Sequence, residues 1–299
     1  MKTILIAGGT GLIGGRLQTM LKEKGYAVRL LTRTPVADDQ YGWDPGLSRI
    51  DERALLGVDA VINLAGAGIA DGRWTPARKK LLIDSRVQSA KLLRDAFQRT
   101  KILPATYLSA SAIGYYGNSG ERRMFETDPP VDQSFMVKCC AEWEEGAAEV
   151  AALGIRTVLF RIGVVLAKEG GALAEFVKPL RLGMGAYFAD GKAWYSWIHR
   201  DDLCRMFIWA LENTQLEGVY NAVAPEPARN KDLVKATAKA MNQPALIVPA
   251  PAFALRVALG EMSAVVLNSN LIADDKIRAT GFLFHFPDLQ SALEDIFKD

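Results

Sequence analysis

Residues 3–14 read TILIAGGTGLIG, an apolar run that leads directly into closely spaced glycines. The run predicts a buried strand, and the next residues predict an amphipathic helix from about Leu12. Glycines at 9, 11 and 14 fit the spacing G-x-G-x-x-G, and glycines at 8, 11 and 14 fit G-x-x-G-x-x-G. Without Cβ atoms the backbone can turn sharply and approach a pyrophosphate at the positive end of the helix. We therefore predict a dinucleotide-binding loop made of Gly8, Gly9, Thr10, Gly11, Leu12, Ile13 and Gly14.

A second apolar run, residues 27–32, completes a predicted strand–helix–strand unit and bears on which cofactor binds. NAD-specific sites place Asp or Glu at the end of this strand, against the ribose 2′-hydroxyl. This sequence has Thr32 and Arg33 there, and its next carboxylate is Asp38. A guanidinium suits a 2′-phosphate, so we predict NADP as the cofactor, with Thr32 and Arg33 at its ribose. The alternatives are that Arg33 is a solvated cation and that the glycines only pack a turn.

Composition limits the possible partners. With 36 basic and 34 acidic residues among 299, the net charge of +2 predicts no binding to nucleic acid or to a membrane surface. The first apolar run is too short for a signal peptide, and no stretch is long enough to span a membrane. The three cysteines have neither metal-ligand nor disulfide spacing, so we predict buried thiols, no metal site and a reducing, cytoplasmic location. A redox role for the adjacent Cys139 and Cys140 is the alternative.

Strands and helices alternate along most of the chain, which predicts an α/β fold with a Rossmann-type doubly wound parallel sheet. The strand in residues 59–66 should end in a tight turn whose Leu64, Ala65 and Gly66 face the cofactor. We predict a dinucleotide-binding domain over residues 1–165, completed by about 196–224, and a smaller substrate-side domain over 166–195 and 225–299. The remaining expected strands are 106–111, 155–161 and 218–221, and the expected helices are 76–100, 138–153, 230–241 and from 289 onward.

Five motifs occur in the order found in extended short-chain dehydrogenase/reductases. They are GGTGLIG at 8–14, NLAG at 63–66, SASAIGYYG at 109–117, RIGVVL at 161–166 and WIHRDD at 197–202. More narrowly, four other parts of the chain resemble the epimerase family 39U1 group, whose members bind NADP and are named nucleoside-diphosphate-sugar epimerases. These parts are Arg73-Trp74, Ser85-Arg86, CAEWE at 140–144 and the tail at 255–289. Some members of that group have also been labelled cell-division inhibitors, for which this sequence offers no residue-level support.

The resemblance also implies catalytic positions. In the superfamily a Ser or Thr binds the substrate oxygen, a Tyr moves the proton, and a Lys four residues later lowers the Tyr pKa and holds the nicotinamide ribose. Ser111 and Lys138 match the serine and lysine positions, while Ser134 stands where the tyrosine belongs. A serine hydroxyl is far less acidic than a phenol and replaces it poorly. The resemblance further implies cofactor contacts at Ser109, Lys138 and Arg161.

Several polar and aromatic residues keep two interpretations each. Ser111 could instead cap a turn, and Lys138 could be a solvated cation. Tyr115, Tyr116 and His199 are candidates for the missing proton donor, although Tyr116 could be a wall residue and His199 a helix cap. Arg86 and Arg161 could bind a ligand anion or buried backbone carbonyls. The aromatic set of Trp194, Tyr195 and Trp197 favours core packing over a sugar-stacking platform.

The sequence therefore predicts an NADP-binding oxidoreductase or epimerase that acts on a small polar substrate, with a sugar derivative as one candidate. The missing tyrosine favours one rival, a non-catalytic NADP(H)-binding sensor or regulatory protein. The sequence does not distinguish a monomer from a homodimer.

Overall fold

The computed structural model describes residues 1–298 and divides the chain into two compact units. Unit 1 comprises residues 1–111, 138–161 and 204–220. Unit 2 comprises residues 112–137, 162–203 and the chain from 221 onward. The substrate-side role expected for residues 166–195 and 225–299 stays a prediction.

A mostly parallel sheet with the strand order β13-β8-β6-β5-β1-β2-β3-β4 forms the centre of unit 1, and its edge strand β4 pairs antiparallel with β3. Strand β1 pairs in parallel with β2 on one side and with β5 on the other, so the strand order reverses beside β1. In doubly wound sheets such a reversal opens a ligand crevice at the carboxyl ends of the strands. The predicted fold class is confirmed. The strands are β1 (Thr3–Ala7), β2 (Ala27–Thr32), β3 (Gln40–Asp44), β4 (Arg49–Ile50), β5 (Ala60–Asn63), β6 (Thr106–Ala112), β8 (Arg156–Ile162) and β13 (Gly218–Ala222).

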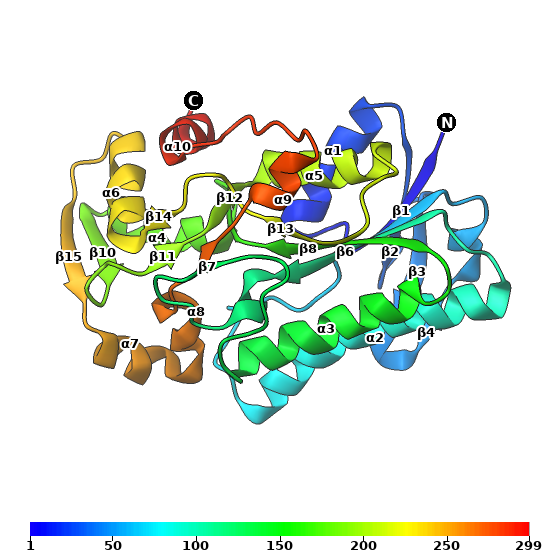
Figure 1. Ribbon diagram of the computed structural model, residues 1–299, viewed down its shortest axis with the longest axis horizontal. Helices are drawn as coiled ribbons and strands as arrows, with labels where there is room; N and C mark the ends of the chain where they lie inside the picture. The colour runs from blue at the N-terminus through cyan, green and yellow to red at the C-terminus, as the bar shows by residue number, and fades with distance from the viewer. Residues whose placement is uncertain (299) are drawn as a thin grey trace. The chain divides into compact units, whose positions relative to one another are not determined.

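Helices pack on this sheet in two groups (Figure 1). Helices α2 (Pro76–Thr100) and α3 (Phe135–Ala151) lie side by side, and a Cβ added at Gly146 would stand 2.9 Å from the Cβ of Ala90. Helices α1 (Leu12–Glu23) and α5 (Arg200–Glu212) form the second group, in which the Sγ of Cys204 lies 3.8 Å from the carbonyl oxygen of Ile13. Close helix contact at Gly146 explains why that position carries no side chain.

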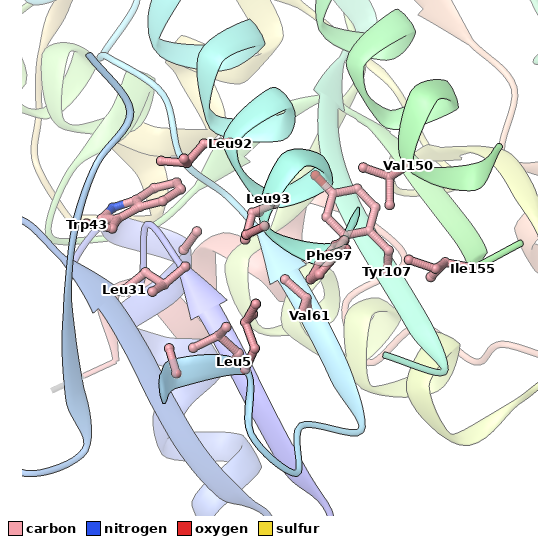
Figure 2. Close-up of a cluster of buried hydrophobic side chains, with 14 of the residues drawn as sticks. Leu5, Leu31, Trp43, Val61, Leu92, Leu93, Phe97, Tyr107, Val150 and Ile155 are labelled. Atoms are coloured by element: carbon pink, nitrogen blue, oxygen red, sulfur yellow. The ribbon is translucent and has the colours of Figure 1, made fainter. Parts of the chain in front are cut away.

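One apolar core joins the sheet of unit 1 to α2 and α3 (Figure 2). Leu5 and Val61 point from the strands toward Leu93 and Phe97 of α2, and all four side chains are fully buried. Burying each such side chain contributes about 1.5–3 kcal/mol. This core fixes the strand ends from which the loops of the site extend.

Two short parts of unit 1 differ from the sequence prediction. Strands β3 and β4, and the 3-10 turns η1 (Pro45–Leu47) and η2 (Glu52–Leu55), lie in a region where no element was expected. The prediction that Lys138 opens a helix was wrong, because α3 begins at Phe135. Residues 135–137 are apolar and contain no Gly or Pro, so the helix continues through them toward its amino end.

Unit 2 is built from two-stranded pairs and short helices around its own core. Helix α4 (Gly171–Leu180) and strand β10 (Met184–Phe188) lie within residues 166–195, in a stretch where no helix or strand was expected. Tyr195 and Trp197 lie in the core of this unit, so the core-packing interpretation holds for both. The paired strands are β7 (Arg123–Met124) with β16 (Leu271–Ile272), β9 (Val164–Leu166) with β12 (Trp197–His199), β10 with β15 (Leu246–Ala250), and β11 (Trp194–Tyr195) with β14 (Ala228–Arg229). The remaining elements are η3 (Ile113–Tyr116), α6 (Asn230–Ala240), α7 (Ala252–Leu259), η4 (Gly260–Ser263), α8 (Ala264–Leu267), α9 (Asp275–Ala279) and α10 (Leu289–Phe297).

All three cysteines are buried and free, as expected for small apolar residues. Burial raises the pKa of the Cys139 thiol, which opposes the thiolate form that redox chemistry needs. Within residues 1–298, no helix combines the length and hydrophobicity of a membrane span. The same residues contain no group of three or more His, Cys, Asp or Glu side chains placed to hold a metal ion.

Candidate functional site

The glycine loop between β1 and α1 depends on missing side chains. Gly8 has a φ of 78°, and a Cβ there would stand 2.7 Å from the carbonyl carbon of Leu64. A Cβ at Gly14 would overlap the carbonyl oxygen of Gly8 and lie 2.7 Å from the Cα of Gly9. At Gly9 it would lie 2.6 Å from the side chain of Leu30. Gly8 and Gly14 are therefore required by neighbouring backbone atoms, whereas the contact at Gly9 is with the end of a side chain that can move.

The exposed side of the loop presents the amino end of α1. Thr10 and Gly11 are exposed, and Gly11 is the N-cap residue in an extended conformation. No side chain among the described residues caps this end, and the first turn, which begins with Leu12 and Ile13, holds no acidic residue. Backbone N–H groups at a helix amino end, together with the helix dipole, favour an anion. The loop therefore fits a pyrophosphate group.

Arg33 follows β2 at the same carboxyl edge of the sheet as the glycine loop, because β1 and β2 run parallel. Its side chain is exposed and, within residues 1–298, makes no hydrogen bond or ion pair. The Oγ1 of Thr32 accepts a hydrogen bond from the backbone N–H of Thr34 at 3.4 Å. Of the nearest carboxylates, Asp38 is exposed and Asp39 pairs with Lys22 at 3.2 Å. The Arg33 guanidinium is thus free to meet a ribose phosphate.

The turn after β5 is held by backbone and amide hydrogen bonds. The Leu64 N–H donates to the carbonyl oxygen of Ala7 at 2.9 Å, and the Ala65 N–H donates to the Oδ1 of Asn63 at 3.1 Å. Asn63 is fully buried, and its Nδ2 donates to the hydroxyl of Tyr107 at 2.9 Å. Burial raises the pKa of Tyr107 to about 12, so this phenol stays protonated. Gly66, which follows, is exposed at the end of the strand.

Ser111, Glu144 and Arg161 form a buried polar cluster. The Ser111 hydroxyl donates to the Oε1 of Glu144 at 2.8 Å. Arg161 holds the same carboxylate with two bonds, from Nε to Oε1 at 2.9 Å and from Nη2 to Oε2 at 2.8 Å. Ser111 is 2% exposed and Arg161 is 4% exposed. The sequence placed Ser111 and Arg161 in the site but missed Glu144, the carboxylate that joins them.

Ser109 and Lys138 stand apart from this cluster. Ser109 is fully buried, and its hydroxyl donates to the carbonyl oxygen of Ala110 at 3.2 Å. Lys138 is exposed, with its Nζ 3.8 Å from the Oε1 of Glu142 one turn along α3. Within residues 1–298, its ammonium forms no bond to Ser111. Cofactor contacts at Ser109, Lys138 and Arg161 stay predictions.

A family model described as NAD dependent epimerase/dehydratase family matches residues 4–222, from β1 to β13. The chain belongs to this family. A second model, described as a domain of unknown function, DUF1731, matches residues 250–296 in unit 2. This epimerase family chain also shares its full length with curated relatives. An epimerase family protein of Staphylococcus aureus (strain NCTC 8325 / PS 47) is 35% identical over 306 aligned residues, which cover 100% of both chains.

Solved structures agree with the family assignment. The human epimerase family protein SDR39U1, crystallised with NADPH, is 30% identical, has a TM-score of 0.90, and is matched over 99% of both chains. A nucleoside-diphosphate sugar epimerase from Corynebacterium glutamicum is 28% identical with a TM-score of 0.80, over 99% of this chain and 58% of the other. These relatives confirm the resemblance to the 39U1 group. The UDP-glucose 4-epimerase of Thermus thermophilus, 20% identical with a TM-score of 0.78, shares the fold.

Two candidate proton donors of this epimerase family chain are committed to structural bonds within unit 2. The Nδ1 of His199 accepts from the Asp201 N–H at 3.1 Å, and its Nε2 lies 3.5 Å from Asp295. Burial lowers the pKa of His199 despite these nearby carboxylates. Tyr116 is fully buried, and its hydroxyl donates to the Oδ1 of Asn221 at 2.7 Å. The capping and wall interpretations therefore fit His199 and Tyr116 better than a catalytic role.

Proposed function

We propose that this chain binds NADP(H) and acts as an oxidoreductase or epimerase on a small polar substrate, with a sugar derivative as one candidate. The observation that carries this proposal is the glycine loop, which leaves no room for a side chain at Gly8 or Gly14 and presents an uncapped helix end. The human relative crystallised with NADPH supports the choice of cofactor. The free Arg33 supports NADP over NAD.

Each group of predicted residues would contact a different part of the cofactor. Residues 8–14 would hold the pyrophosphate, Thr32 and Arg33 the phosphorylated ribose, and Leu64 to Gly66 the turn beside it. Lys138, Ser109 and Arg161 are proposed for the nicotinamide half. When bound, NADP(H) supplies a site that gives or takes a hydride.

Ser111 has a distinct role in this proposal. The Glu144 carboxylate accepts two hydrogen bonds from Arg161 and a third from the Ser111 hydroxyl, so the Ser111 proton is committed to Glu144. The lone pairs of Ser111 remain available to accept from a substrate hydroxyl. We therefore expect Ser111 to bind an alcohol in preference to a carbonyl group.

A second candidate function is a non-catalytic sensor of NADP(H). Two observations favour it: Ser134 occupies the usual tyrosine position, and the Lys138 ammonium is exposed beside Glu142. In this alternative the glycine loop binds the cofactor and contacts with a partner report its presence.

Titration of the purified protein with NADPH and NADH, followed by fluorescence, tests the cofactor proposal. Preference for NADPH supports it, and no binding of either nucleotide contradicts it. Turnover is then measured as NADPH oxidation with carbonyl compounds and nucleotide sugars, and as NADP⁺ reduction with the matching alcohols. Background rates with every compound, together with tight NADPH binding, would favour the sensor. We further expect a small-molecule partner and a reducing, cytoplasmic location, which the three free cysteines support.

A further inference from the structure

Arg86 of α2 is a cation without an anionic partner. Its Nη1 donates to the carbonyl oxygen of Leu82 in the same helix at 2.9 Å. Its Cζ lies 4.8 Å from the ring centroid of Trp143 on α3. Within residues 1–298, no carboxylate forms an ion pair with this guanidinium, which is only partly exposed. Most of its five N–H donors are therefore uncommitted.

Two other arginines of unit 1, one buried and one partly buried, have most of their guanidinium donors paired. Arg161 is held by the carboxylate of Glu144 through two bonds. Arg156 donates to the carbonyl oxygens of Ala210 and Leu216 and to the hydroxyl of Thr106, at 2.7 to 2.9 Å. Arg86 has neither arrangement, and the other charged arginine near it, Arg78, has the same sign. The surroundings of Arg86 thus favour an incoming anion.

Trp143 adds a second uncommitted donor beside Arg86. The residue is 7% exposed, and its Nε1 is buried without a hydrogen-bond acceptor among the described residues. A buried N–H group of this kind is normally paired. Arg86 and Trp143 therefore place two kinds of unsatisfied donor within one small region of unit 1.

This pair borders the carboxyl end of β5. A Cβ added to the exposed Gly66 would lie 3.2 Å from the Cζ of Arg86, so the guanidinium lies directly against this turn. The Ala67 N–H donates to the hydroxyl of Ser85 at 3.0 Å, which ties the turn to α2. Ligands of doubly wound sheets bind outside the carboxyl ends of the strands. The Arg86 guanidinium therefore lies at that edge of the sheet, with the Trp143 ring beside it.

We propose that Arg86 and Trp143 form an oxyanion site for an acidic group, a carboxylate or a phosphate, of the substrate. The proposal rests on the proposed function, because it assigns the acidic group to the substrate of that site. Arg86 supplies a planar fork that matches either oxyanion, and Trp143 supplies one further N–H. Arg78 adds positive charge, part of which is already offset by Asp71 at 3.4 Å.

Isothermal titration calorimetry of the NADP⁺-saturated protein tests this site without requiring turnover. The probes are sodium glucuronate, glucose as its neutral counterpart, and inorganic phosphate, all at one ionic strength. We expect glucuronate or phosphate to bind at least 10-fold more tightly than glucose. Arg86→Gln should weaken that binding at least 10-fold, and Trp143→Phe should weaken it less because it removes only one N–H donor. Arg99→Gln, on the same helix but exposed and paired with Glu52, is the matched control and should bind like the wild type.

NADPH affinity, measured in parallel, separates the two possible sources of the oxyanion. Affinity within two-fold of wild type in Arg86→Gln supports a substrate group, whereas a 10-fold loss would assign Arg86 to a cofactor phosphate and overturn the proposal. Equal binding of glucuronate and glucose, no binding of any probe, or unchanged phosphate and glucuronate binding in Arg86→Gln would overturn it as well. If Arg86→Gln does not fold, Arg86→Lys keeps the charge and should still lose affinity, because it lacks the fork. Failure of these tests with intact NADPH preference would leave the proposed function standing.

Discussion

The glycine loop and the Ser111–Glu144–Arg161 cluster belong to the same unit but are built in opposite ways. The loop is defined by side chains that are missing, and its helix end carries backbone donors that no described side chain caps. The cluster is defined by side chains that satisfy one another in the interior. A ligand can therefore use the loop as it stands, whereas it meets in the cluster a serine whose proton is already committed. Cofactor binding and proton transfer would therefore depend on two different groups of residues in this chain.

The largest expected effect comes from breaking the cluster. Glu144→Leu leaves the Arg161 charge buried without its carboxylate, and we expect the free energy of unfolding to fall by about 3–5 kcal/mol. Urea denaturation measures this loss. Glu149→Leu, which removes an exposed partner of Arg94, is the control and should cost about 0–1 kcal/mol. A Glu144→Leu protein as stable as the control would show that the cluster contributes little to folding.

Adding a methyl group to the glycine loop should have the next largest effect. In Gly14→Ala the new Cβ overlaps the carbonyl oxygen of Gly8, so we expect a loss of about 1–3 kcal/mol in stability and at least a 10-fold loss in NADPH affinity. Gly15→Ala, whose Cβ would have its nearest neighbour at 4.0 Å, should be tolerated or stabilising. Thermal denaturation and fluorescence titration measure both variants. Equal behaviour of the two would refute the steric account of the loop.

Arg33→Ala should change affinity without changing stability. A charge-assisted bond to a 2′-phosphate is worth about 1.5–3 kcal/mol, so NADPH should bind at least 10-fold more weakly while NADH binding stays the same. The matched control is Arg53→Ala, an exposed arginine that pairs with Asp51 instead. If NADPH and NADH weaken together in Arg33→Ala, the residue does not select the cofactor.

Lys138→Ala should have the smallest effect. Its ion pair with Glu142 is exposed, so the loss of stability should be below about 0.5 kcal/mol. If the lysine still holds the ribose, NADPH affinity falls about 2- to 5-fold, less than in Arg33→Ala. Glu142→Gln breaks the same ion pair while keeping the lysine, and it should leave NADPH affinity unchanged. No change in Lys138→Ala would mark this lysine as a surface cation.

Much of unit 1 could be predicted because its local signals agree with its tertiary structure. The bounds of β1, β2 and α2 match the expected ranges residue for residue, and α2 starts where Thr75 caps the N–H of Arg78 and Pro76 follows. Helix α4 was missed because it begins at a glycine and contains Pro179. Such residues normally end a helix, and here packing into the core of unit 2 outweighs them.

The glycine loop and the Ser111–Glu144–Arg161 cluster also differ in how far each could be predicted from the sequence. The glycine loop was predictable, because its backbone geometry requires glycines at fixed spacings within one short stretch of the sequence. Glu144 was not, because it stands among three other acidic residues on α3, where a charge usually indicates a solvated face. Its partner Arg161 lies 17 residues away, and only the packing of α3 against β8 brings the two together.

The uncapped start of α1 has a consequence for how this protein would respond to its ligand. The first N–H groups of this helix find no side-chain acceptor within residues 1–298, so their hydrogen bonds are left to solvent or to a ligand. At other helix amino ends the side chain of a Ser, Thr or Asp at the N-cap commonly supplies this acceptor. A bound pyrophosphate would supply it here, so that the ligand would act as the cap of α1. The ordering of α1 and the occupancy of the loop would then be one equilibrium, visible as amide protons near Leu12 that exchange more slowly when the ligand is present.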